Sequence, residues 1–226
     1  MIKHLKLVIY LAVVIGISSV KAGTYEDFFT AVNRDDGDTV QMLVKQGFDP
    51  NSRNPAGQTA LHLALRDQSP RVIRALMESP ALDVNAINAS GESPLMMAAL
   101  RGDLDRVGQL LARGAKVHQD GWSPLHYAAT GPEPKVVALL LDRGAPIDAF
   151  SPNRTTPLMM AAGYGVEASV DLLLARGADK RLRNDRDLDA AGFATLCRAV
   201  CTQVAIELDG DPQVDPSDRL IPAMYR

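Results

Sequence analysis

The chain has 226 residues and a formal net charge of −3 at pH 7. This excess of negative charge argues against a nucleic-acid partner, because nucleic acids are bound through a basic stripe or patch. Three of the lysines precede residue 23, so the rest of the chain carries a formal charge of −6 and the exclusion becomes stronger.

The first 22 residues are expected to form an export signal. Lys3 and Lys6 give a positive start, 7–17 is an apolar stretch, and Val-Lys-Ala at 20–22 is a small-residue cleavage site. The apolar stretch is much shorter than the ~20 residues that span a bilayer, which favours cleavage after Ala22 over an uncleaved membrane anchor. We therefore expect the mature chain to be periplasmic or secreted, without insertion into a membrane.

A six-residue phrase recurs along the chain at intervals of about 33 residues. It reads Thr-Ala-Leu-His-Leu-Ala at 59–64, Ser-Pro-Leu-Met-Met-Ala at 93–98, Ser-Pro-Leu-His-Tyr-Ala at 123–128 and Thr-Pro-Leu-Met-Met-Ala at 156–161. Ser or Thr before Pro is typical of a helix N-cap and first turn, and Leu and Ala three residues apart share one face. Each phrase therefore predicts a short helix with a narrow apolar edge.

A second phrase, Val-x-x-Leu-Leu-x-x-Gly, follows at 107–114, 137–144 and 170–177. It predicts a second helix with a broader apolar stripe, ended by a glycine in the left-handed conformation. One pair of helices leaves apolar surface uncovered on both sides, so neighbouring pairs must stack. The sequence thus predicts an all-α repeat solenoid.

These phrases resemble the ankyrin repeat, over roughly residues 24–208. The resemblance implies helix-turn-helix repeats joined by β-hairpin loops, with about four clear repeats between degenerate caps at 25–51 and 185–208. It also implies that the phrase histidines, His62 and His126, tie neighbouring hairpins together. Binding to a metal is the weaker interpretation, because no cluster of His, Cys and carboxylate ligands is evident. The methionines of the phrase are expected to fill the core, with an adaptable binding stripe or an oxidant sink as the alternative.

One loop breaks the rhythm of the repeats. Pro124 comes ten positions after Gly114, whereas Pro157 comes 13 positions after Gly144. A shortened hairpin is therefore expected at about 116–122, either through neutral variation of a surface loop or as a notch for a partner.

The C-terminal part leaves two questions open. Cys197 and Cys201 favour a disulfide in an exported chain, but a spacing of four on one intact helix is poor geometry for the bond. Residues 209–226 are expected to form an acidic, flexible tail. A calcium loop is disfavoured there, because the EF-hand pattern requires Gly and Glu where this chain has Val214 and Leu220.

The sequence favours a binding module over an enzyme, since motifs such as Gly-x-Ser-x-Gly, the phosphate-binding loop and His-Glu-x-x-His are missing. The resemblance implies a monomer that needs no cofactor and that binds, and protects or regulates, another protein through its hairpin tips and concave groove. Two alternatives remain: an immunity protein or inhibitor that masks an exported toxin or hydrolase, and an enzyme with groove carboxylates. The implied partner-binding residues are Gln58, Arg66, Glu92, Arg101, Trp122, Arg154 and Tyr164. Trp122 also has a structural interpretation, in which it folds over the shortened loop and covers the neighbouring helix.

Overall fold

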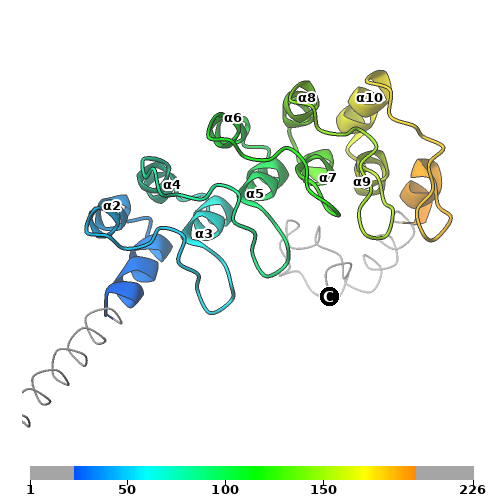
Figure 1. The fold of residues 1–226 in the computed structure, drawn as a ribbon. Helices are drawn as coiled ribbons and strands as arrows, with labels where there is room; N and C mark the ends of the chain where they lie inside the picture. The colour runs from blue at the N-terminus through cyan, green and yellow to red at the C-terminus, as the bar shows by residue number, and fades with distance from the viewer. Residues whose placement is uncertain (1–22, 197–226) are drawn as a thin grey trace, which may run out of the picture.

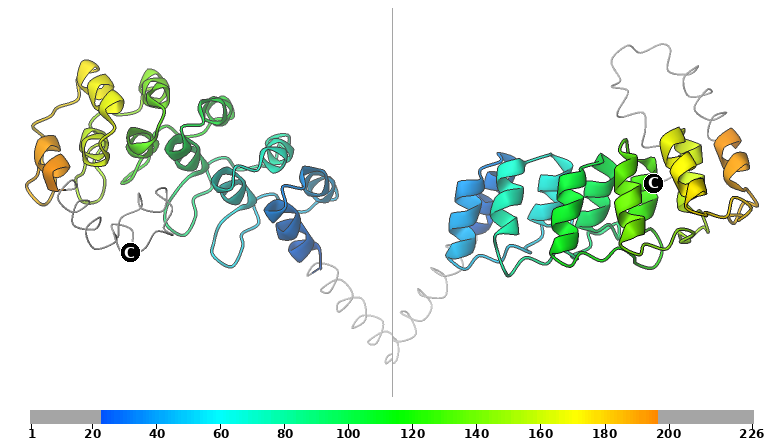
Figure 2. Two further views of the ribbon diagram at one scale, coloured as in Figure 1. Left: turned by 180° about the vertical axis from the view of Figure 1, so that it is seen from behind. Right: turned by 90° about the horizontal axis from the view of Figure 1, so that it is seen from above.

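The computed structural model describes residues 23–196, which form a curved stack of helix pairs (Figure 1). The expected export signal at 1–22, the two cysteines and the tail at 209–226 lie outside the described residues. The first helix of every pair lies in an inner row and the second in an outer row, and long loops project from the inner row (Figure 1). Figure 2 shows the pairs following one another in chain order along the stack.

The inner row contains residues 23–33, α3 (Ala60–Arg66), α5 (Pro94–Arg101), α7 (Pro124–Thr130), α9 (Pro157–Tyr164) and a helix that begins at residue 190. The outer row contains α2 (Gly37–Lys45), α4 (Pro70–Met77), α6 (Leu104–Ala112), α8 (Pro134–Asp142) and α10 (Glu167–Ala175). The prediction of an all-α repeat solenoid is confirmed.

The helix boundaries follow from the repeated phrases. The hydroxyl of Ser93 accepts a hydrogen bond from the amide of Met96 at 3.3 Å, and Pro94 starts α5. Gly114, directly after the last turn of α6, has a φ of 84°. A residue with a β-carbon is strained in that conformation, so glycine ends the helix and redirects the chain. The predicted N-cap positions and closing glycines are confirmed. Thr156 accepts the equivalent amide bond at 3.3 Å, whereas the hydroxyls of Thr59 and Ser123 each lie 2.8 Å from a histidine Nδ1.

One continuous core separates the two rows. Each phrase leucine of the inner row is at most 2% exposed, as is its counterpart from the outer row. These residues are Leu61, Leu95, Leu125 and Leu158 inside, and Leu76, Leu110, Leu140 and Leu173 outside. Burial of one such side chain stabilises the fold by about 1.5–3 kcal/mol, so the leucine ladder supplies much of the stability of the stack.

A carboxylate from the first pair caps a helix of the second. Asp35 has a φ of 52°, and its Oδ1 atom accepts hydrogen bonds from the amides of Arg71 at 3.0 Å and Val72 at 2.9 Å. These two amides belong to the first turn of α4, where no backbone acceptor is available within the helix. The contact therefore joins the two pairs as well as completing α4.

The loops before α3, α5, α7, α9 and the helix at 190 are here called fingers 1 to 5. They are built from tight turns, and within the described residues the only β-bridge outside a strand pairs Arg53 with Thr59. In finger 1 the amide of Asn54 donates to the carbonyl of Gln58 at 2.8 Å, and in finger 2 the amide of Asn88 donates to the carbonyl of Glu92 at 2.9 Å. Finger 3 is visibly shorter than its neighbours, as the residue count predicts (Figure 1).

Candidate functional site

The seven predicted binding residues lie along both edges of the inner row and do not form one cluster. Gln58, Glu92, Trp122 and Arg154 belong to the fingers, whereas Arg66, Arg101 and Tyr164 lie at the C-terminal ends of α3, α5 and α9. The three arginines are exposed and the other four residues are partly buried. The arrangement therefore offers a long, shallow contact surface between fingers and helix ends.

Glu92 is held by three neighbouring groups. Its Oε1 atom accepts a hydrogen bond from the hydroxyl of Tyr127 at 2.9 Å, and its Oε2 atom accepts one from the amide of the Asn88 side chain at 2.7 Å. Its backbone carbonyl lies 2.9 Å from Nε2 of His62. Glu92 thus joins three consecutive repeats, and Gln58, at the same place in finger 1, is likewise bonded within its own turn.

Trp122 lies partly buried against α7. Its ring meets that of His126 edge-on, with centroids 5.3 Å apart and an interplanar angle of 79°. This packing agrees with the structural interpretation of Trp122, while the part of the ring that stays exposed remains available to a partner.

Arg154 takes a different place from its proposed counterparts. It occupies the turn position with a φ of 59°, where fingers 1, 2 and 3 have glycine. Thr155 takes the place of Gln58 and Glu92, and it is fully buried. The guanidinium of Arg154 lies over the ring of Phe150, 4.4 Å from its centroid. Phe150 is 36% exposed and was not among the residues that the sequence singled out.

At the other edge, Arg66 forms a forked ion pair with Asp67. The two N–O distances are 2.7 and 2.9 Å, and these hydrogen bonds raise the pKa of Arg66 and lower that of Asp67. Arg101 donates to the backbone carbonyl of Arg66 at 2.8 Å, so two of the predicted binding residues are in direct contact. A planar guanidinium with nitrogens to spare is well suited to a carboxylate of a partner.

Comparison with known proteins decides the family. A model for ankyrin repeats in three copies matches residues 28–120 and 95–184. The chain belongs to the ankyrin-repeat family. The ankyrin repeat domain of Bcl-3, described as a unique member of the IkappaB protein family, superimposes with a TM-score of 0.63 at 31% identity, over 76% of this chain and 81% of that one.

Curated relatives show the same similarity over the repeats. The mouse B-cell lymphoma 3 protein homolog is 34% identical over 154 residues, which are 65% of this chain and 34% of that protein. Protein glp-1 of Caenorhabditis elegans is 27% identical over 169 residues, 68% of this chain and 13% of that protein. The chain thus spans about a third or less of the length of these relatives.

The ankyrin histidines have the structural role that the resemblance implied. Nε2 of His126 lies 3.0 Å from the carbonyl of Thr155 in the next finger, and Nδ1 lies 2.8 Å from the hydroxyl of Ser123. His62 makes the equivalent pair of contacts. Burial lowers the pKa of both rings, that of His126 to about 4. Within residues 23–196 no three His, Cys, Asp or Glu side chains are grouped to hold a metal.

The phrase methionines belong to the core. Met96 and Met159 are at most 1% exposed, Met160 is 3% exposed, and the partly buried Met97 packs against the same core. The prediction that they fill the interior of the ankyrin stack is confirmed.

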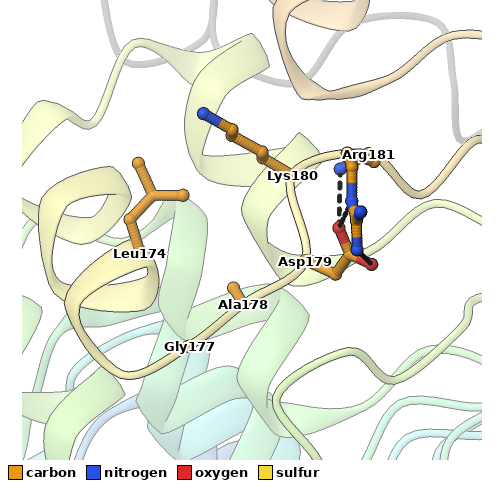
Figure 3. A pocket seen from close by; sticks show the side chains of 6 residues that line it. All are labelled: Leu174, Gly177, Ala178, Asp179, Lys180 and Arg181. Atoms are coloured by element: carbon orange, nitrogen blue, oxygen red, sulfur yellow. Dashed lines mark hydrogen bonds and ion pairs between the residues drawn. The ribbon is translucent and has the colours of Figure 1, made fainter.

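An open depression of about 620 Å³ lies at the C-terminal end of α10. It is lined by Leu174, Gly177, Ala178, Asp179, Lys180 and Arg181 (Figure 3). The guanidinium of Arg181 is paired with the carboxylate of Asp179 at 3.0 Å, and Lys180 points away from this pair (Figure 3). The lining contains no nucleophile beside a base, so its chemistry is that of a surface contact.

Among the described helices, none has the length and apolar character required to cross a bilayer.

Proposed function

We propose that the chain is a small exported ankyrin-repeat protein of the bacterial type, which binds another protein in the periplasm and protects or regulates it. Ankyrin repeats in general mediate protein–protein interactions, which supports a binding role for this chain. The export step rests on the charged, apolar and small-residue segments that follow one another within residues 1–22.

One observation carries the binding proposal. A row of exposed or partly exposed arginine and aromatic side chains follows the inner edge of a stack whose interior is closely packed. Arginine, tryptophan and tyrosine are enriched among the residues that dominate protein–protein binding. Arg66, Arg101 and Tyr164 at one edge and Trp122 at the other are the side chains best placed to act as anchors.

The test is affinity capture from a periplasmic extract, with the chain from Gly23 onward as bait and mass spectrometry as the readout. A specific partner is retained by this bait and lost when Trp122 and Tyr164 are both changed to Ala. The matched control changes Arg74 and Arg143 to Ala, because these arginines lie at the outer row. A partner that follows the control variant would place the binding face on the outer row, and a stable complex with an exported toxin or hydrolase would identify an inhibitor instead.

Export is tested separately. Fractionation of expressing cells should recover the chain in the periplasm, and sequencing of its N-terminus should begin at Gly23. Recovery of the unprocessed chain in the membrane fraction would identify residues 1–22 as an anchor.

A further inference from the structure

The fingers carry apolar surface that the core does not use. Ile87 is 48% exposed and Phe150 is 36% exposed, and Val117 on the finger between them packs partly against the core and keeps the rest of its surface exposed. Each of the three lies seven residues before the first residue of the helix that follows, so they occupy equivalent places on fingers 2, 3 and 4. We call Ile87, Val117 and Phe150 the finger strip. Its middle member belongs to finger 3, the shortest of the fingers that carry the strip (Figure 1).

Each end of the strip carries an arginine. Arg53 holds the equivalent place on finger 1, and its Nη1 atom donates to the carbonyls of Ile87 and Gly57, both at 2.7 Å. At the other end Arg154 lies over the ring of Phe150. Neither arginine forms an ion pair with a carboxylate of the described residues. The strip is therefore apolar in its middle and positive at both ends.

We propose that residues 209–218 of this same chain dock along the finger strip and cover it. The segment reads Asp-Gly-Asp-Pro-Gln-Val-Asp-Pro-Ser-Asp, with Val214 near its middle and aspartates at both ends. Its two prolines disfavour a helix and suit an extended chain. Its four aspartates give it a charge opposite to that of the arginines, and with the two terminal aspartates at the arginines Val214 lies between Val117 and Ile87 along the strip.

The lengths agree as well. Packed helices lie about 8–10 Å apart, so the three steps from finger 1 to finger 4 span roughly 24–30 Å. An extended chain advances by about 3.3 Å per residue, so the nine steps from Asp209 to Asp218 cover roughly 30 Å. The order of the elements places Asp209 at Arg154 and Asp218 at Arg53.

The tail has the reach that this arrangement needs. The described part of the chain ends in the helix that follows finger 5, and finger 4 is the next one along the stack (Figure 1). The intervening residues 197–208 span at most about 40 Å when extended, more than two steps between repeats. A tethered segment has an effective concentration in the millimolar range, so even a weak contact is occupied until a competing partner displaces it. The tail would thus compete with a partner for the finger strip. This inference does not depend on the identity of the partner.

The experiment compares the whole chain with a chain ending at Leu208, using a fluorescent peptide of residues 207–220 and anisotropy as the readout. The shortened chain should bind the peptide, and the whole chain should bind it at least about tenfold more weakly, because its own tail occupies the strip. In the shortened chain, Phe150→Ala and Arg154→Ala should each weaken binding by about fivefold or more. The control Met42→Ala removes a side chain that is as exposed as Ile87, at 48%, but lies in the outer row, and should have no effect.

A second arm keeps the chain intact. Changing Asp209, Asp211 and Asp218 to Asn in the whole chain should release the strip and restore peptide binding, and added salt should weaken the contact. Equal binding to both chain lengths, no binding to the shortened chain, or equal effects of Phe150→Ala and Met42→Ala would each overturn the proposal. Self-association of the shortened chain that the peptide does not reverse would assign the strip to a second copy of the chain instead. Circular dichroism confirms that each variant is folded.

Discussion

The Nε2 atom of His126 lies 3.0 Å from the backbone carbonyl of Thr155, and this contact ties α7 to finger 4. A neutral imidazole serves both of its neighbours here, since one ring nitrogen donates to the carbonyl while the other accepts at the N-cap. In the adjacent repeats Met96 and Met159 hold the same place, and a thioether has no N–H to donate. Histidine ties therefore alternate with methionine along the stack.

The buried histidine makes stability depend on pH. Burial lowers the pKa of His126 from 6.5 to about 4, so the folded chain favours the neutral ring. Its contribution is complete above the unfolded pKa near 6.5 and is lost as the pH falls towards 4, by up to about 3 kcal/mol. Urea unfolding at pH 7, 5.5 and 4.5 measures this loss.

The variant His126→Gln is the control for that titration. It should be less stable than the natural chain at pH 7, and the gap should narrow as the pH falls from 6.5, because glutamine does not titrate. A gap that stays constant from pH 7 to pH 4.5 would mean that protonation of His126 is not coupled to unfolding.

A cross-repeat cap should contribute to the stability of the N-terminal end. Asp35→Ala removes the acceptor of the amides of Arg71 and Val72 and should lower the free energy of unfolding by about 1 kcal/mol, the usual cost of losing a helix cap. Asp27→Ala is the control, because Asp27 is exposed on the helix at 23–33. Chemical denaturation measures the free energy of unfolding of both variants. If Asp35→Ala is as stable as Asp27→Ala, the cap contributes little.

The repeating part of the fold was predictable from the sequence, because its determinants are local and periodic. Ser93 before Pro94 specifies the start of α5, and Gly114 specifies the end of α6, with no reference to the rest of the chain. The hydrogen bonds of the finger residues were not predictable in this way. Two of the hydrogen bonds to Glu92 come from His62 and Tyr127, 30 and 35 residues away in opposite directions, and such contacts exist only once the repeats have stacked.

The position of Arg154 shows a second limit. A count from the helix start places Thr155, rather than Arg154, at the site equivalent to Gln58. The sequence suggested otherwise because Arg154 replaces the glycine that marks this turn in fingers 1, 2 and 3. Its contact with Phe150 was likewise hidden, since an isolated aromatic residue in a loop gives no periodic signal.

The last described helix should cap the C-terminal end of the hydrophobic core. Phe193 is 4% exposed and packs into the common hydrophobic core, whereas Leu196 on the same helix is 38% exposed. Phe193→Ala should destabilise the chain by about 3–5 kcal/mol, because it leaves a cavity beneath the end of the stack. Leu196→Ala should cost much less. Thermal unfolding of the two variants makes the comparison, and similar melting temperatures would show that the stack ends before this helix.

Substitutions at the inner edge should weaken partner binding, whereas matched substitutions in the outer row should not. Once a partner has been captured, Trp122→Ala and Tyr164→Ala should each weaken its binding by about 1–3 kcal/mol, the range expected of aromatic anchors at an interface. Both side chains also pack against the core, so part of any loss comes from local loosening. Titration calorimetry at a temperature where each variant is folded separates the two effects.

Arg74→Ala and Arg143→Ala, in exposed positions of the outer row, should leave the affinity within about 0.5 kcal/mol of the natural value. If the outer arginines weaken binding while all seven inner-edge residues tolerate substitution, the partner binds the outer row and the inner face has another role.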